Sequence, residues 1–173
     1  KAPAPVGAGK YDDTHASWSY GGTWVTYSGS GPYNNTEHYT NVVGSTASFT
    51  FTGSQFVFSY LANTNRGNIE VRVDGALVTT INANGALTWQ KTYTSPAFSP
   101  GAHTVVFKFT GPAGMYADVD AIQIVNADLN APDGVGSLSA VTGTANGSIN
   151  LSWTAPANDA GNPVHRFFNR TRY

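Results

Sequence analysis

Residues 47–60 have the sequence ASFTFTGSQFVFSY, and this stretch decides the fold. Apolar and polar side chains alternate from Ala47 to Thr52, and the alternation resumes at Phe56 after the turn residues Gly53-Ser54. A period of two places successive side chains on opposite faces of a β-strand. The stretch therefore predicts two strands, each with one face turned towards a core.

The same pattern continues on both sides of this stretch. Apolar positions alternate with polar ones in 69–73, 77–81 and 105–109, and a last apolar run covers 119–124. Asp74-Gly75 lies between the first two of these runs and is typical of a tight hairpin turn. Since no segment has a helical period of 3.6, short strands with regular turns predict an all-β protein with a β-sandwich jelly roll.

Composition excludes several classes of function. The chain has 173 residues and a net charge of −1, so it has no field that would attract nucleic acid or anionic lipid. It has no cysteine, which excludes disulfides, zinc–thiolate sites and thiol catalysis. No apolar run approaches the roughly 20 residues of a membrane span, so we expect no membrane insertion. The chain begins at Lys1 rather than Met, and we expect it to be a piece of a longer protein.

Changes in composition divide the chain into three parts. The β-rich pattern covers residues 8–126, and a Pro/Asp/Gly-rich linker covers 127–134. The remaining segment, 135–173, contains two further predicted strands at 135–141 and 147–156. A segment of that length is too short to bury a sandwich core of its own.

Acidic residues cluster at the two ends of the first domain. Asp12 and Asp13 lie near its start, and Asp118 and Asp120 lie near its end, in a chain where only 11% of residues are charged. If the first and last strands pair, these carboxylates meet, and carboxylate oxygens are the ligands that Ca²⁺ prefers. We therefore predict a structural calcium ion held by Asp12, Asp13 and Asp120. The alternative is that Asp12 and Asp13 cap turns while Asp120 accepts hydrogen bonds from backbone N–H groups.

Several segments, taken in order, resemble the carbohydrate-binding β-jelly-roll modules of the galactose-binding-like class. They are Tyr11–Thr14, Tyr27–Ser30, Gly44–Gly53, Asn65–Gly67, Val71–Gly75, Ser99–Val105 and Val119–Ile122. The sequence GSINLSWTAP at 147–156 resembles an early strand of a fibronectin type III domain, of which 135–173 is only the N-terminal part. The resemblance implies a carbohydrate-binding module of a secreted or cell-surface bacterial protein, and calcium between the terminal strands.

Loop aromatics are the candidate sugar-binding residues, because the apolar faces of sugars stack on Trp and Tyr rings while amides and Arg bind hydroxyl groups. Arg66 and Trp89 are the leading pair, and a sugar site would also draw on Asn63, Tyr93, Tyr116 and Trp24. The alternative for each aromatic residue is a place in the core.

Catalytic groups are harder to find. Glycoside hydrolysis needs two paired carboxyl groups. Glu37 is expected in a polar loop beside His38, and Glu70 is expected to pair with Arg72, so neither has a second carboxylate. The four histidines are dispersed. We therefore predict that the protein is not an enzyme but a non-catalytic carbohydrate-binding module. The alternative is a structural or adhesin subunit that self-associates by strand addition through its incomplete C-terminal strands.

Overall fold

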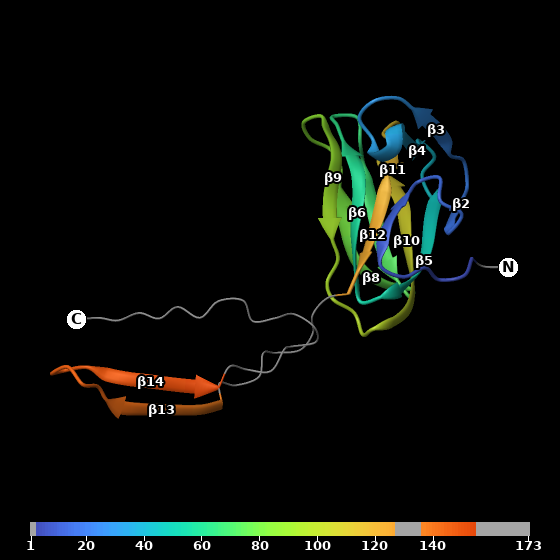
Figure 1. The fold of residues 1–173 in the computed structure, drawn as a ribbon. Coiled ribbons are helices and arrows are strands. Elements are labelled where there is room, and N and C mark those ends of the chain that lie inside the picture. Colours follow the sequence, from blue (N-terminus) through green and yellow to red (C-terminus); the bar gives the residue numbers. More distant parts are fainter. Residues whose placement is uncertain (1–2, 127–135, 155–173) are drawn as a thin grey trace. The chain divides into compact units, whose positions relative to one another are not determined.

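A computed structural model describes residues 3–126 and 136–154 (Figure 1). The chain divides into two compact units, Lys1–Ala127 and Asp128–Tyr173, and each is described by itself. The predicted linker at 127–134 and the last part of the predicted fibronectin-like segment, 155–173, lie outside the described residues. Among the residues that are described, no helix is long and apolar enough to cross a membrane.

Unit 1 is a sandwich of antiparallel strands, as the alternation predicts. One sheet has the strand order β1-β12-β6-β9, a second has β2-β5-β10-β7-β8, and a third, smaller sheet has β11-β4-β3. The strands are β1 (Gly9–Asp12), β2 (Trp18–Gly21), β3 (Val25–Ser28), β4 (Thr36–Thr40), β5 (Thr46–Gly53), β6 (Gln55–Ala62), β7 (Asn68–Val73), β8 (Ala76–Asn82), β9 (Thr88–Thr94), β10 (Gly101–Gly111), β11 (Ala117–Val119) and β12 (Ala121–Val125).

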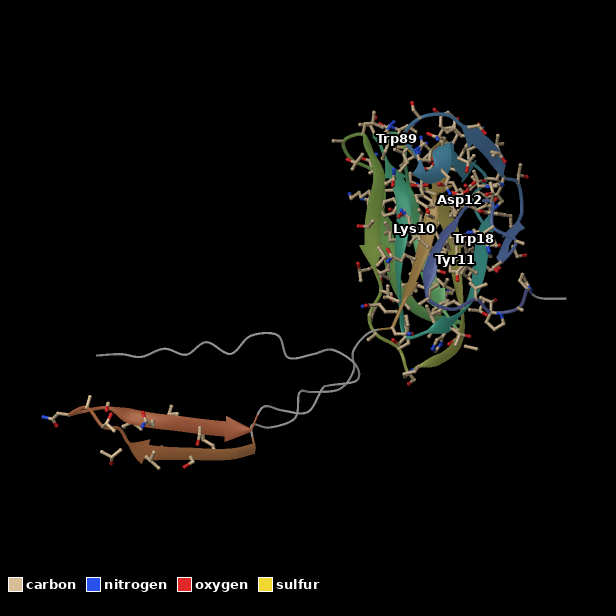
Figure 2. The ribbon with its side chains drawn as sticks, in the orientation of Figure 1. Lys10, Tyr11, Asp12, Trp18 and Trp89 are labelled. Carbon is tan, nitrogen blue, oxygen red and sulfur yellow. The ribbon has the colours of Figure 1, made fainter. Side chains whose placement is uncertain are left out.

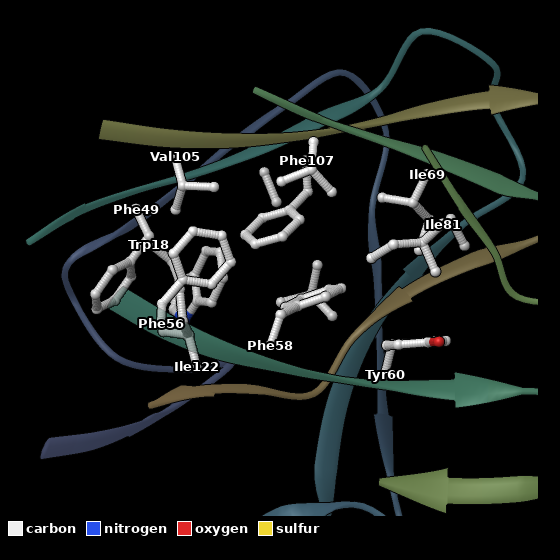
Figure 3. Packing of buried hydrophobic residues seen from close by; sticks show 14 of the residues in the cluster. Trp18, Phe49, Phe56, Phe58, Tyr60, Ile69, Ile81, Val105, Phe107 and Ile122 are labelled. Carbon is white, nitrogen blue, oxygen red and sulfur yellow. The ribbon is translucent and has the colours of Figure 1, made fainter. Parts of the chain in front are cut away.

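Aromatic side chains fill the space between the two larger sheets (Figure 3). The ring of Phe58 on β6 stacks on Phe107 of β10, with centroids 3.9 Å apart. Phe49 and Phe51 of β5 and Phe56 of β6 are fully buried. Each such ring removes a large apolar area from water, and burial of one side chain of this size is worth roughly 1.5–3 kcal/mol. The quoted stretch therefore contributes to both layers, because the chain changes sheet at Gly53-Ser54.

The first and last strands of unit 1 pair, which brings its two acidic segments together. Strand β1 is antiparallel to β12, and Asp12 is opposite Ala121. The backbone N–H of Asp13 donates to the carbonyl of Asp120 at 2.9 Å. The predicted last strand at 119–124 is interrupted at Asp120, so that β11 and β12 belong to different sheets. Figure 2 labels Lys10, Tyr11 and Asp12 of β1.

Strand β4 corrects the expectation that Glu37 and His38 lie in a polar loop. It pairs with β11, where Tyr39 is opposite Asp118, and with β3, where Tyr27 is opposite Glu37. Its sequence, Thr-Glu-His-Tyr-Thr, lacks the apolar alternation that identified the other strands, yet Glu37 and Thr40 are buried. The small sheet that contains β4 forms part of the wall described below.

Unit 2 has two described strands, β13 (Gly136–Thr142) and β14 (Ile149–Thr154), which pair as an antiparallel hairpin. They fall where the sequence predicts strands. Four of their large apolar side chains are exposed, namely Leu138, Val141, Ile149 and Leu151. A two-stranded hairpin is marginally stable in water by itself. The fibronectin type III assignment of this segment stays a prediction.

Candidate functional site

A cavity of about 480 Å³ opens in unit 1 between the small sheet, strand β9 and two loops. It is lined by Tyr27, Glu37, Tyr39, Leu61, Asn63, Asn65, Arg66, Leu87, Trp89 and Tyr116. Four of the six predicted ligand-binding residues are in this set: Asn63, Arg66, Trp89 and Tyr116. A concave site with aromatic walls and a few polar groups is the usual form of a small-molecule site.

One wall of the cavity is a pair of stacked rings. Trp89 of β9 stacks on Tyr27 of β3, with centroids 5.9 Å apart and planes 19° apart. The backbone of Gly31 lies against the indole, where a Cβ atom would collide with the ring, and its φ of +124° also favours glycine. The Gln90 amide donates to the Gly31 carbonyl at 3.0 Å. Trp89, labelled at one end of the sandwich in Figure 2, is therefore held in place by its neighbours.

Arg66 is fixed by a turn and by an ion pair. Its backbone N–H donates to the Asn63 carbonyl at 3.0 Å, and it forms a parallel β-bridge with Tyr116. Its guanidinium donates from Nε and Nη2 to the two carboxylate oxygens of Asp118, at 2.5 and 2.9 Å. A third donor, Nη1, reaches Asn65 at 2.7 Å. Since Asp118 is fully buried, most of the hydrogen-bonding capacity of Arg66 is committed to the fold.

A second aromatic pair lies beside Arg66. Tyr116 meets Tyr39 of β4 edge to face, with centroids 6.0 Å apart. The Arg66 guanidinium lies 5.4 Å from the centre of the Tyr116 ring, which is within the range of a cation–π contact. Tyr39 also lines the cavity, and it lies on β4 opposite Asp118 of β11.

Glu37 is the charged lining residue that the sequence did not predict. Its side chain is 3% exposed, and its Oε2 has no hydrogen-bond partner among the described residues. Burial raises the pKa of Glu37 to about 8, the Asp118 carboxylate adds to this rise, and Arg66 opposes it. Burial also raises the pKa of Asp118, and its interactions with Arg66 and Glu37 oppose that rise. Because Arg66 donates to both oxygens of Asp118, Glu37 is the carboxyl group of the two that more readily holds a proton.

The other two predicted ligand-binding residues lie outside the cavity. The Trp24 indole N–H donates to the carbonyls of Gly21 and Thr46, each at 3.1 Å, and its ring packs against the core. Tyr93 lies on β9 with its ring 6.3 Å from Phe56, and it too packs against the core. Both are held by the fold, which is the alternative that the sequence left open for any aromatic residue.

The predicted metal ligands are close together but occupied in different ways. Asp13 is fully buried. Its Oδ1 accepts a hydrogen bond from the Thr36 hydroxyl at 2.7 Å, and its Oδ2 is hydrogen-bonded to the His38 ring Nδ1 at 2.6 Å. Asp12 accepts the hydroxyl groups of Thr14 and Thr36 on Oδ2, and Asp120 accepts the backbone N–H of Tyr33 on Oδ1. The Asp120 contact is the backbone hydrogen bond of the alternative, whereas Asp13 contacts side chains of β4 and does not cap a turn.

Two carboxylate oxygens in this cluster remain without partners. Asp12 Oδ1 and Asp120 Oδ2 are buried and lack hydrogen bonds in the described part of the chain. Burial raises the pKa of Asp120 to about 6, and the charge of Lys10 opposes that rise. The chemistry of the two free oxygens fits a cation. However, residues 3–126 and 136–154 contain no group of three or more Asp, Glu, His or Cys side chains arranged to hold a metal ion.

No family model matches the chain. By sequence, it is 35% identical over 104 residues to the A type blood N-acetyl-alpha-D-galactosamine deacetylase of Flavonifractor plautii, and the match covers 60% of this chain and 13% of that protein. It is also 35% identical over 88 residues to the A type blood alpha-D-galactosamine galactosaminidase of the same organism, covering 49% of this chain and 8% of that protein. The chain thus spans a small part of the length of each curated relative.

Among solved structures, the fold is similar to the CBM36-1 domain of a multidomain xylanase from the hindgut metagenome of Trinervitermes trinervoides. The TM-score is 0.51 at 19% sequence identity, and the similarity covers 69% of this chain and 97% of that one. At this identity the likeness concerns the fold alone. Unit 1 therefore has the β-sandwich jelly roll found in carbohydrate-active proteins.

These comparisons contradict the prediction that the protein is not an enzyme, since both sequence relatives are named for enzymatic activities. The physical premise of that prediction was also wrong. Glu37 does have a second carboxyl group beside it, because the pairing of β4 with β11 brings Asp118 next to it at the cavity. Glu70 is as expected, with Arg72 Nε at 2.7 Å, although the two residues lie on the same strand rather than on facing strands.

Proposed function

We propose that unit 1 is a glycan-binding domain of a secreted or cell-surface carbohydrate-active enzyme, and that the cavity at Trp89 and Arg66 binds the sugar. The observation that carries this proposal is the cavity itself, whose stacked Trp89–Tyr27 wall and amide and guanidinium groups suit a sugar ring. The jelly roll and the two enzyme relatives support it. Because those relatives are named for galactosamine-type sugars, galactose-configured sugars are the first ligands to test.

The test is a binding measurement on wild type and two variants. Trp89→Ala removes the stacking platform and should weaken binding about fivefold to tenfold, since an aromatic contact of this kind is worth on the order of 1 kcal/mol. Leu77→Ala is the control, because Leu77 is an exposed apolar residue on β8 that does not line the cavity. Glycan arrays and isothermal titration provide the readout. Absence of any sugar ligand for the wild type, or equal loss in both variants, would overturn the proposal.

We also propose a structural calcium ion at Asp12 and Asp120. Its support is the pair of buried carboxylate oxygens without partners, together with the pairing of the first and last strands. Asp13 is already occupied by Thr36 and His38, so backbone carbonyls or water would complete the coordination. An ion that binds only the native state raises the melting temperature by mass action. A melting temperature that is the same in calcium and in a chelator would remove calcium from the proposal.

Self-assembly through unit 2 is the second candidate function. The observation that favours it is the exposure of Leu138, Val141, Ile149 and Leu151 on a hairpin that has two described strands. A second copy of this chain could cover them by adding strands to the hairpin, in a fibronectin-like arrangement. Light scattering over a range of concentrations tests this idea. A strict monomer at every concentration would exclude it.

A further inference from the structure

Carboxyl groups outnumber cations around the cavity. Glu37 lines the cavity, is buried, and has an Oε2 without a hydrogen-bond partner in the described part of the chain. The carboxyl groups of Asp118, Asp120 and Asp13 each disfavour its ionised form. Arg66 is the cation that acts in the opposite direction, and its donors are already directed to Asp118 and Asn65. A buried carboxyl group that has no cation of its own is costly unless it holds a proton or receives a charged partner.

The cavity walls suit a positive charge as well. Trp89 and Tyr27 face the cavity as a stacked pair, and Tyr39 is edge to face with Tyr116. Aromatic faces attract ammonium groups, most strongly in sites from which water is excluded. A ligand ammonium beside Glu37 would therefore gain from the carboxyl groups and from the rings together. A neutral hydroxyl group in the same place would gain one hydrogen bond.

We propose that the cavity selects sugars that carry a protonated amino group, and that Glu37 is the residue that recognises the ammonium. This inference rests on the proposed glycan-binding function and adds a substrate class to it. Glu37 is a specificity-determining residue: the ligand ammonium displaces the proton of Glu37 to solvent, and the carboxylate then binds the ligand nitrogen as a charge-assisted partner, while Trp89 stacks on the sugar ring. Arg66 acts indirectly, since it pairs with Asp118 and lowers the pKa of that carboxyl group beside Glu37.

Three sugars with the same ring configuration separate this proposal from simple sugar binding. D-Galactosamine carries the ammonium, D-galactose carries a hydroxyl group in its place, and N-acetyl-D-galactosamine carries a neutral amide. Titrations at about pH 6.5 keep the amino group protonated, since that pH lies below the usual pKa of an amine. The wild type should bind galactosamine at least about tenfold more tightly than either neutral sugar, because the charge contributes both a cation–π and an ionic contact.

Variants at Glu37 then identify the residue responsible. Glu37→Gln keeps the shape and the hydrogen-bonding capacity but cannot ionise, so it should bring the ratio of the two affinities close to one. Glu37→Asp retains the carboxyl group and should retain the preference. Glu70→Gln is the matched control, because Glu70 pairs with Arg72 on β7 and does not line the cavity. Circular dichroism confirms that each variant is folded before it is titrated.

The outcomes are distinguishable. If the wild type bound all three sugars equally, or if Glu37→Gln kept the preference, the amine proposal would be overturned while the glycan-binding proposal would stand. If no sugar bound, the glycan-binding proposal itself would fail, and the amine proposal with it. All titrations are repeated in calcium and in a chelator. A galactosamine preference that exists only with calcium would assign the site to a metal cation and would also overturn the amine proposal.

Discussion

Two consecutive residues of strand β4 face two different buried carboxylates, and the contrast separates a structural cluster from a binding site. His38 points to Asp13, whose oxygens are both occupied, one by Thr36 and one by His38 itself. Glu37, on the other face of the strand, meets Asp118 and has an oxygen without a partner. Satisfied polar clusters stabilise a fold, whereas an unsatisfied group beside a cavity has capacity left for a ligand.

The stacking around His38 shows how thoroughly its side of the strand is filled. The Tyr20 ring lies parallel to the imidazole at 4.3 Å, and its hydroxyl donates to the Asp13 carbonyl at 2.7 Å. Burial raises the pKa of Tyr20, so that this hydroxyl stays a donor. The second imidazole nitrogen, Nε2, lies 3.3 Å from the Thr26 hydroxyl. The polar side-chain atoms of Asp13 and His38 therefore all have partners, which is the opposite of the situation at Glu37.

The largest expected effect comes from the ion pair that supports the cavity. Arg66→Ala leaves the Asp118 carboxylate buried without its partner, and loss of one member of a buried pair costs about 3–5 kcal/mol. Urea unfolding followed by tryptophan fluorescence measures the change. Arg72→Ala is the matched control, because Arg72 is 42% exposed and pairs with Glu70 at the surface. Equal destabilisation by the two variants would show that Asp118 does not depend on Arg66.

The second largest effect is expected at Asp13, which pairs with His38 on one face of β4. Asp13→Asn keeps the size of the side chain but removes the charge that pairs with His38, and we expect a loss of about 2 kcal/mol, typical of a buried hydrogen bond to a charged group. Thr26→Ala removes the weaker contact at the exposed side of the same imidazole and should cost much less. The same urea titration compares them. An Asp13→Asn variant as stable as the wild type would refute the structural role.

Glu37→Gln should raise the free energy of unfolding, whereas the variants of Arg66 and Asp13 should lower it. The folded-state pKa of about 8 lies above the ordinary value of 4.5, so the folded state holds a proton that the unfolded state releases. Wild-type stability therefore falls as pH rises from about 4.5 through about 8. The Gln variant lacks this loss and should be more stable than the wild type by on the order of a few kcal/mol at neutral pH and above.

Unfolding free energies measured from pH 4.5 to pH 9 test the sign. The advantage of the Gln variant should grow with pH over this range, and it should be smallest at the acid end, where Glu37 is protonated in both states. A wild type that became relatively more stable as pH rose would mean that Glu37 is ionised in the folded protein. Such a result would also weaken the contrast with Asp13.

The sequence predicts the sandwich well because apolar alternation is a local signal. The alternation that includes Phe49, Phe51 and Phe58 predicts their strands even when the partner strands are not known. It also predicts that the terminal acids meet, since that requires only the first and last strands to pair. Asn63, Arg66, Trp89 and Tyr116, which residue type and loop position predicted, all line the cavity.

The position of Glu37 in a buried strand could not be predicted from apolar alternation or residue type. Its strand buries polar side chains, so the alternation that marks the other strands is missing, and the sequence resembles a polar loop. Its partner Asp118 is 81 positions away, and only the pairing of β4 with β11 brings the two together. Trp24 and Tyr93 were predicted to bind sugar but lie outside the cavity. An aromatic residue outside an alternating run can still pack against the core, and residue type does not distinguish the two cases.

The smallest expected effect tests whether a surface pair behaves differently from both buried clusters. His103 Nδ1 lies 2.7 Å from Asp74, whose side chain is 52% exposed. The side-chain hydrogen bond with Asp74 raises the pKa of His103 above its ordinary 6.5. A raised histidine pKa stabilises the folded state below pH 6.5, and this contribution disappears as pH rises through the folded-state value. Because solvent screens so exposed a partner, the contribution should be below about 0.5 kcal/mol.

Asp74→Asn removes this pairing and keeps a residue that tolerates the φ of +50° at the hairpin turn. The variant should therefore be slightly less stable than the wild type near pH 5.5, with a smaller difference at pH 8.5, by urea unfolding at both values. Added salt should reduce the difference at pH 5.5, whereas it should leave the Arg66→Ala effect largely unchanged, since buried pairs are screened much less. A salt-insensitive loss at Asp74 as large as that at Asp13 would show that exposure does not separate these pairs, and the contrast across β4 would then need another cause.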